Sequence, residues 1–195
     1  MKVNEIFYSL QGEGANTGTP AIFVRFSGCN MKCHFCDTNF EDGKEMTEEE
    51  IVDEVCKLST ACHFVVLTGG EPTLQVTPSL VDKLHQNGYM VGMESNGTNP
   101  APFNINWLTI SPKVPDNPTA RQILKVKKCH ELKLVFGSVF EPSDYGIEAQ
   151  YYYLQPCDTG DPVKNERIIN DCVEYIKQHP KWKLSLQTQK ILKVR

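Results

Sequence analysis

Three closely spaced cysteines, Cys29, Cys33 and Cys36, constrain the fold and chemistry of this chain more than any other feature of its sequence. They directly follow the segment 21–26, whose β-branched and aromatic content predicts a strand. Three thiolates can each bind one iron of a [4Fe–4S] cluster, and no fourth cysteine lies nearby in the sequence. The spacing therefore predicts a cluster on the loop 29–36 whose fourth iron is open to a ligand that the protein does not supply.

A zinc site formed by these cysteines and His34 is the alternative for the same segment. His34 lies between Cys33 and Cys36, so its ring would have to converge with an adjacent thiolate and with another two residues away. This arrangement is unfavourable, and we prefer the iron–sulfur interpretation. The remaining five cysteines are scattered without a ligand spacing, and we expect a cytoplasmic chain to keep them as thiols.

Composition and charge narrow the class of protein. The longest apolar stretches, such as 64–67, fall far short of the roughly 18 residues that a membrane span needs. The N-terminus also lacks the apolar region of a signal peptide, so we expect a cytoplasmic protein that does not bind membranes. A formal net charge of −4 argues against a broad basic surface for nucleic acid. At 195 residues the chain fits one domain, 1–195.

Predicted strands alternate with helices or loops along the chain, which implies a mainly parallel sheet. Strands are predicted at 6–10, 21–26, 63–67, 89–93, 107–110, 131–136 and 150–154, with 184–186 as a candidate last strand, and helices at 47–58, 78–86 and 167–178. The connection 96–106 contains two prolines and is too short for a full crossover helix. A complete eight-unit barrel needs about 200 residues or more. We therefore expect an α/β fold, a compressed partial (β/α)6 barrel.

Polar motifs follow several of these predicted strands. They are the segments 68–72 (Thr-Gly-Gly-Glu-Pro), 94–98 (Glu-Ser-Asn-Gly-Thr), 111–113 (Ser-Pro-Lys) and 155–158 (Gln-Pro-Cys-Asp). Each could be an ordinary turn. Because functional sites of parallel barrels gather at the carboxyl ends of strands, the motifs together predict one ligand surrounded by the sheet. The N-terminal turn 10–14 (Leu-Gln-Gly-Glu-Gly) adds an amide and a carboxylate, which can hydrogen-bond the edge of a pterin or a guanine.

The cysteine spacing and the Gly-Gly-Glu-Pro element resemble the radical S-adenosylmethionine (SAM) superfamily. With Leu-Gln-Gly-Glu-Gly, Cys-Asp-Thr at 36–38 and the segment 185–190, the chain is similar from Asn4 onward to 7-carboxy-7-deazaguanine synthases. The resemblance implies the radical SAM type of partial barrel, a [4Fe–4S] cluster and SAM, with Mg²⁺ assisting. In that family a 5′-deoxyadenosyl radical removes hydrogen from C6 of 6-carboxy-5,6,7,8-tetrahydropterin. Ring contraction and loss of ammonia then give 7-carboxy-7-deazaguanine, a precursor of queuosine and other 7-deazapurines.

The resemblance also assigns roles to individual residues. It implies that Cys29, Cys33 and Cys36 are the cluster ligands and that Thr38 is a ligand of Mg²⁺. The residues that it implies bind the pterin substrate are Leu10, Gln11, Gly12, Glu13, Arg25, Thr68, Gln189 and Arg195. The residues that it implies bind SAM are Gly70, Glu71, Ser95, Ser111, Pro112, Lys113, Gln155, Pro156, Cys157 and Asp158. It further implies an electron donor such as flavodoxin and a homodimer.

Gln189 departs from the pattern of this family, which usually has a histidine at that position near the substrate. A glutamine cannot carry a positive charge, so its contact with a carboxylate would be a neutral hydrogen bond. The geometry at this end of the pocket is therefore not determined by the resemblance.

Two other functions are compatible with a three-cysteine loop. A glycyl-radical-activating enzyme has a protein partner and less need of the polar turn 10–14. An iron–sulfur electron carrier or a zinc structural module would not require the glycine and proline motifs at the other strand ends. These motifs favour the radical SAM synthase over both alternatives.

Overall fold

The computed structural model describes residues 1–39, 41–113, 124–137 and 141–195. Its strands are β1 (Lys2–Leu10), β2 (Pro20–Phe26), β3 (Lys44–Glu45), β4 (Phe64–Gly69), β5 (Met90–Ser95), β6 (Trp107–Ile110), β7 (Lys128–Phe136), β8 (Glu148–Pro156) and β9 (Lys183–Leu184). Its helices are α1 (Glu48–Leu58), α2 (Pro78–Gln86), α3 (Pro162–Gln178) and α4 (Thr188–Leu192), with 3₁₀ turns η1 (Gly14–Asn16) and η2 (Pro72–Leu74). No helix in these described ranges is long and apolar enough to cross a bilayer.

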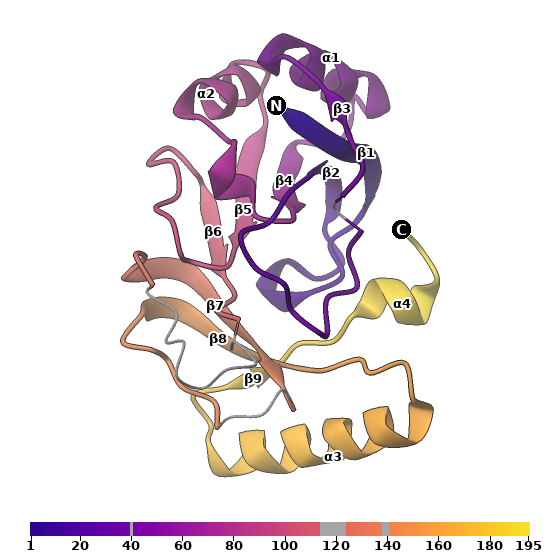
Figure 1. Ribbon diagram of the computed structural model, residues 1–195, viewed down its shortest axis with the longest axis vertical. Coiled ribbons are helices and arrows are strands. Elements are labelled where there is room, and N and C mark those ends of the chain that lie inside the picture. Colours follow the sequence, from indigo (N-terminus) through magenta and orange to yellow (C-terminus); the bar gives the residue numbers. More distant parts are fainter. Residues whose placement is uncertain (40, 114–123, 138–140) are drawn as a thin grey trace.

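All strands belong to one sheet with the order β3-β1-β2-β4-β5-β6-β7-β8-β9 (Figure 1). Neighbouring strands from β2 to β9 pair in parallel, whereas β1 and β3 are antiparallel additions at one edge. The sheet has two free ends, β3 and β9, and does not close. This confirms the partial barrel. Within the described residues, the connection 96–106 contains no helix, as its two prolines predict.

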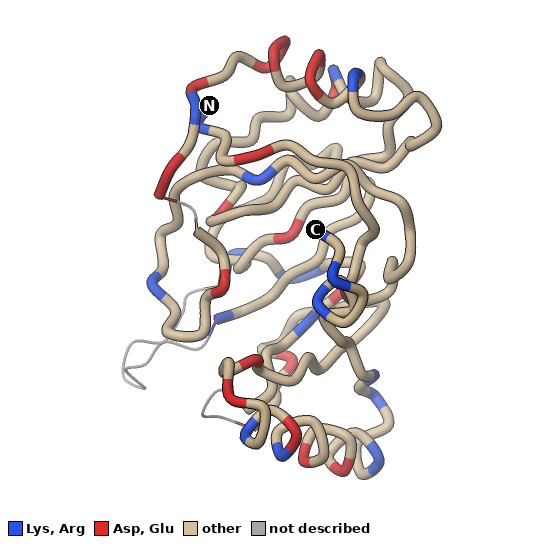
Figure 2. The backbone as a smooth tube through the Cα atoms, turned by 90° about the vertical axis from the view of Figure 1, so that its right-hand side faces the viewer, with Lys and Arg blue, Asp and Glu red and all other residues tan. Residues whose placement is uncertain are grey.

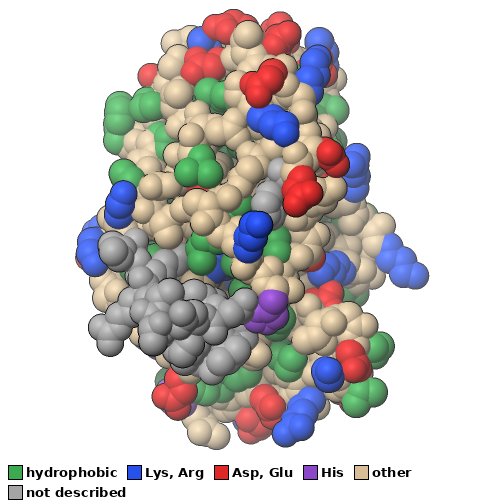
Figure 3. Space-filling view, in the orientation of Figure 1, with side chains coloured by type: hydrophobic (Ala, Val, Ile, Leu, Met, Phe, Trp, Pro, Cys, Tyr) green, Lys and Arg blue, Asp and Glu red, His purple; other side chains and the backbone are tan. Residues whose placement is uncertain are grey.

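Helices α1 and α2 cover the outer face at one end of the sheet, and α3 covers it at the other (Figure 1). One core joins apolar residues of α1 and α2, such as Ile51 and Leu80, to Ile22 and Leu67 on the strands. A second core joins Cys172 of α3 to strands β6 to β8. The capping box at the start of α1 is present, and its acidic first turn lies in the cluster of acidic side chains seen over α1 in Figure 3.

Three elements differ from the sequence prediction. The helix expected at 167–178 begins at Pro162, because Asp161 caps it by accepting from the backbone amides of Val163 and Lys164 and a proline suits the first turn. The strand β3 and the helix α4 were not predicted. Both are too short to show a hydrophobic period, and each depends on tertiary contacts.

The pleat of the strands separates the two faces of the sheet. On β2, Ile22 and Val24 are fully buried in the core beneath the helices, and Arg25 faces the inner side of the sheet. The register pairs Arg25 with Thr68, so both side chains lie on that inner face. The same alternation on β5 and β7 places Glu94 and Lys133 there. The inner face is therefore polar toward the carboxyl ends of the strands.

Candidate active site

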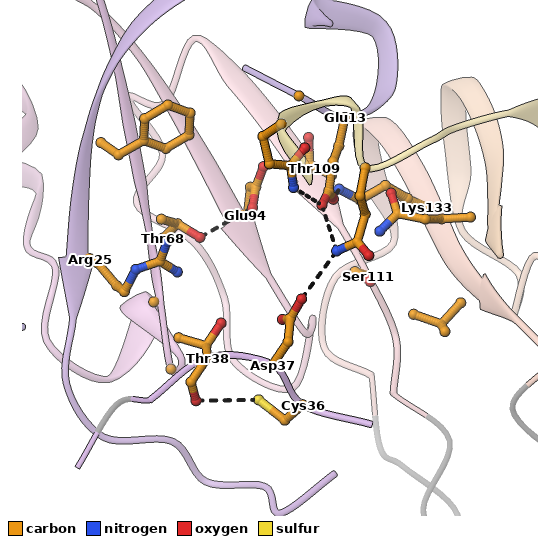
Figure 4. Close-up of a pocket in the computed structure, with 18 of the residues that line it drawn as sticks. Glu13, Arg25, Cys36, Asp37, Thr38, Thr68, Glu94, Thr109, Ser111 and Lys133 are labelled. Carbon is orange, nitrogen blue, oxygen red and sulfur yellow. Dashed lines mark hydrogen bonds and ion pairs between the residues drawn. The ribbon is translucent and has the colours of Figure 1, made fainter. Parts of the chain in front are cut away.

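A cavity of about 480 Å³ opens at the carboxyl ends of the parallel strands. Its lining comes from β1, β2 and β4 to β8, from the cysteine loop and from the C-terminal segment 187–195 (Figure 4). All the site residues predicted from the sequence line this cavity except Glu71 and Pro112. The structure thus brings together residues that lie as far apart in the sequence as Leu10 and Arg195.

The cysteine loop forms one wall of the cavity. Cys29, Cys33 and Cys36 are free thiols, and a hydrogen bond of 3.1 Å from the Cys36 amide to the Cys33 carbonyl tightens the turn between them. Burial raises the pKa of the Cys29 thiol, and the nearby Glu71 carboxylate adds to this shift, whereas the Lys113 ammonium opposes it. Within the described ranges, no three Cys, His, Asp or Glu side chains could hold one metal ion, as a tetrahedral zinc site requires. A [4Fe–4S] cluster instead takes its thiolates on separate irons, so its three cysteines do not have to converge on one ion.

Gly69, the last residue of β4, and Gly70 after it let this strand end lie directly against the start of the cysteine loop. The Gly70 amide donates to the Phe26 carbonyl at 3.0 Å, and the Glu71 amide donates to the Gly28 carbonyl at 2.9 Å. A Cβ atom on Gly70 would collide with the Gly28 carbonyl and lie 3.2 Å from Cys29 Cβ. Only glycine permits this approach, so the motif fixes the position of the first cysteine.

Glu71 is not among the residues that line the cavity, and its assignment to SAM stays a prediction. Its side chain is fully buried and accepts hydrogen bonds from Ser95 Oγ (2.8 Å), the Asn96 amide (2.7 Å) and the Thr73 amide (3.1 Å). Its carboxylate therefore holds the end of β5, and Ser95 and Asn96 line the cavity in its place. Pro112 likewise lies outside the lining, between Ser111 and Lys113, which belong to it.

A buried hydrogen-bond group around Glu94 was not predicted from the sequence. Gln11 Nε2 donates to Glu94 Oε1 at 3.0 Å, and Thr68 Oγ donates to Glu94 Oε2 at 3.1 Å (Figure 4). Glu94 thus lies between two residues that the family resemblance assigns to the substrate. Its carboxylate offers acceptors for the donors of an amino-pyrimidinone edge.

Glu13 forms the centre of a second polar group. One carboxylate oxygen pairs with the Lys133 ammonium, and the other accepts from Gln187 Nε2 (3.3 Å) and Gln189 Nε2 (3.0 Å). Burial alone would raise the pKa of Glu13, but the charge and hydrogen bond of Lys133 outweigh it and lower this pKa to about 2. Burial would lower the pKa of Lys133, and the surrounding carboxylates Glu13, Glu94 and Glu131 raise it instead. The pair is therefore ionic at neutral pH.

Arg25 lies on the opposite side of the cavity, near Thr38 and Thr68 (Figure 4). Its Nε donates to Glu5 Oε1 at 2.8 Å, and its guanidinium lies 5.7 Å from the centre of the Phe7 ring. Arg195 pairs with the other oxygen of Glu5 and also lies over Phe7, at 5.2 Å. Two cations thus share one carboxylate at this side of the cavity, which suits an anionic group of a ligand.

Sequence reasoning gave no role of their own to five residues that line the cavity: Glu5 and Lys133 belong to none of the motifs, and Asp37, Glu94 and Gln187 enter only as members of a motif. For Glu94 and Lys133 a signal was available. Each is a charged residue in a parallel strand between two apolar neighbours or next to one, where charge is costly unless it is paired or serves a site. Nothing in the local sequence marks Glu5 or Gln187, because their partners are remote along the chain.

Comparison with known proteins gives concordant results. The profile of the Radical SAM superfamily matches residues 23–179. A 7-carboxy-7-deazaguanine synthase from Bacteroides thetaiotaomicron is 46% identical, over 100% of this chain and 98% of its own, and one from Bradyrhizobium diazoefficiens is 38% identical, over 99% and 98%. The crystal structure of QueE from Escherichia coli superimposes with a TM-score of 0.72 and 27% identity, over 95% of this chain and 92% of that one.

Proposed function

The chain belongs to the 7-carboxy-7-deazaguanine synthase family of the radical SAM superfamily, and we propose that it converts 6-carboxy-5,6,7,8-tetrahydropterin into 7-carboxy-7-deazaguanine with release of ammonia. The main support for this proposal is that the cysteine loop lines the same cavity as Gln11 and Glu13, whose polar groups can hydrogen-bond a pterin. A glycyl-radical-activating enzyme or an electron carrier would not need that combination. The product belongs to the route to queuosine and related 7-deazapurines.

In this proposal Cys29, Cys33 and Cys36 hold the [4Fe–4S] cluster at the wall of the cavity. When bound, the cluster and SAM together supply a carbon-centred radical that removes a hydrogen atom from the substrate. The cavity residues proposed to bind SAM are Gly70, Ser95, Ser111, Lys113 and the segment 155–158. They lie at the ends of four different strands, so the sheet orients SAM relative to the cysteine loop.

The substrate is proposed to lie between the two polar groups and Arg25. Gln11, Glu13 and Glu94 offer an amide and two carboxylates to the amino-pyrimidinone end of a pterin. Arg25 offers a planar cation to the substrate carboxylate, a geometry that favours two parallel hydrogen bonds. Because Arg25 is held by Glu5 on one edge, its orientation is fixed before the substrate arrives.

Thr38 is proposed to contribute a ligand to Mg²⁺. It directly follows Cys36 and Asp37, and the Cys36 thiol contacts its carbonyl oxygen at 3.7 Å, so it stays beside the cluster loop. Oxygen atoms of hydroxyl and carboxylate groups suit this hard cation. Asp37 lines the cavity next to it.

We further propose a cytoplasmic enzyme that receives electrons from a small donor protein such as flavodoxin and acts as a homodimer without binding nucleic acid or membranes. The family resemblance supports the donor and the dimer, and the formal net charge of −4 argues against a broad basic surface for nucleic acid.

An assay with the anaerobically reconstituted chain tests the proposed function. With SAM, Mg²⁺ and a reductant, it should bind about four irons and form 7-carboxy-7-deazaguanine from carboxytetrahydropterin, with many turnovers per SAM. Arg25→Ala should raise the KM for this substrate at least about tenfold, because the carboxylate loses its charged partner. Cleavage of SAM without any deazapurine product would reject the proposal, and a glycyl radical formed on a partner protein would favour the activating enzyme.

A further inference from the structure

Lys190 joins two segments of the active site that are far apart in the sequence. Its ammonium lies 2.8 Å from Asp37 Oδ2 on the cysteine loop and 2.8 Å from Asp158 Oδ2 at the end of β8. Lys190 belongs to α4, in the C-terminal segment that crosses in front of the sheet and carries several basic residues (Figure 2). One cation therefore connects the cysteine loop, a proposed SAM-binding segment and the C-terminal segment.

Each carboxylate of this bridge is held by further groups. Asp158 Oδ1 accepts from Asn165 Nδ2 at 2.7 Å and from the Gly160 amide at 3.0 Å, which fixes it against the start of α3. Asp37 Oδ2 also accepts from Gln187 Nε2 at 3.2 Å, and the same amide reaches Glu13 at 3.3 Å. The lysine thus links two carboxylates of which at least one is already rigid.

The other half of the cysteine loop has its own attachment. Asn30 donates to Thr98 Oγ at 2.8 Å and accepts from Asn96 Nδ2 at 2.9 Å, so the loop is tied to the end of β5 near Cys29. Near Cys36, the contacts of Asp37 with Lys190 and Gln187 give the corresponding attachment. The loop therefore has a tether beside each of its outer cysteines.

We propose that Lys190 is a positioning residue that holds the Cys36 end of the cysteine loop against the SAM-binding segment 155–158. The proposal rests on the proposed function for the identity of the ligand, but the tether itself is a property of the chain. Lys190 does not line the cavity, so it acts through Asp37 and Asp158, which do. The expected consequence of its loss is weaker binding of SAM with little change in the chemical step.

The expected size of the change in SAM affinity depends on how far the three charged side chains are exposed to solvent. The side chains of Lys190, Asp37 and Asp158 are 39%, 55% and 36% exposed, so a single pair here would contribute little. Two pairs sharing one ammonium, with one carboxylate fixed by other donors, should together change affinity by about three- to tenfold.

The test compares Lys190→Met with Lys190→Arg and with Lys177→Met, which removes an exposed ion pair to Glu174 on α3, away from the cavity. Hydrogen exchange of the segment 29–38 is measured in the whole chain before reconstitution. The KM for SAM and kcat are measured after it. Lys190→Met should speed exchange in this segment and raise the KM for SAM about three- to tenfold, while kcat changes less than twofold. Lys190→Arg should keep the exchange rate of this segment and the KM for SAM close to those of the unsubstituted chain. Lys177→Met should leave these two quantities unchanged.

Unchanged exchange in Lys190→Met, or an equal effect of Lys177→Met, would overturn the tether. A drop in kcat with an unchanged KM for SAM would also overturn it, because a positioning role predicts the opposite. If the unsubstituted chain makes no deazapurine, the proposed function fails, and hydrogen exchange still decides whether Lys190 orders the cysteine loop.

Discussion

Replacing Lys133 with methionine should destabilise the protein strongly at neutral pH. The Lys133 and Glu13 side chains are only 8% and 16% exposed, so the substitution leaves a buried carboxylate without its cation. Removing one partner of such a pair costs about 3–5 kcal/mol in free energy of unfolding. The lowering of the Glu13 pKa from 4.5 to about 2 gives a similar figure, about 3 kcal/mol.

The pH dependence separates this cause from simple loss of packing. In the unsubstituted protein the pKa of Glu13 is depressed, so its contribution is present above pH 4.5 and is lost as the pH falls toward 2. In Lys133→Met we expect burial, the largest influence on Glu13, to outweigh the remaining hydrogen bonds from Gln189 and Gln187 and to raise the pKa of Glu13 above its ordinary value. The variant is then destabilised as the pH rises through that higher pKa, so its deficit should grow between pH 4.5 and neutrality.

Urea unfolding of the whole chain, followed by circular dichroism from pH 4.5 to 8, measures these differences. Glu13→Gln in the Lys133→Met background should recover at least about 1 kcal/mol, because it removes the unpaired charge. Lys177→Met, which removes an exposed pair, should cost under about 1 kcal/mol. A loss below about 1 kcal/mol for Lys133→Met at pH 7, or a loss that is independent of pH, would refute the reasoning.

Two further predictions concern the cysteine loop. Gly70→Ala should lower the iron bound after reconstitution to less than half, because its Cβ would displace Gly28 and Cys29, whereas Gly18→Ala, where a Cβ meets nothing within 4 Å, should keep full iron content despite its positive φ. Iron analysis of both purified variants checks this, and full iron content in Gly70→Ala would contradict it. Thr38→Ala should keep the cluster and SAM binding but lose most of the Mg²⁺ dependence of turnover, measured by titrating Mg²⁺ in the product assay; undiminished stimulation would place the ion elsewhere.

The helices and strands with strong local signals could be predicted from the sequence. The α2 helix has the predicted bounds, because Pro78 and the Asn87-Gly88 pair mark its ends locally. The α1 helix likewise begins within one residue of its predicted start, because Thr47 and Glu50 form a capping box there. The start of α3 was missed although Asp161 and Pro162 signal it, because its first turn lacks a clear apolar period. The short elements β3 and α4 carry no local signal of their own.

The sequence by itself predicted a cluster on the cysteine loop, from three cysteines at short spacings, and it determined the partial barrel, because strands alternate with helices in a chain too short for a complete one. Only the tertiary structure decided which charges meet. It buried Glu71 against Ser95 at the end of β5, and it brought Glu13, Lys133 and Gln189 together from three distant segments. The physical reason is that a strand's pleat and register set the direction of each side chain, whereas long-range ion pairs depend on how the whole sheet curves. The alternation of side chains along a strand can be predicted from the local sequence, whereas the pairing of distant charges cannot.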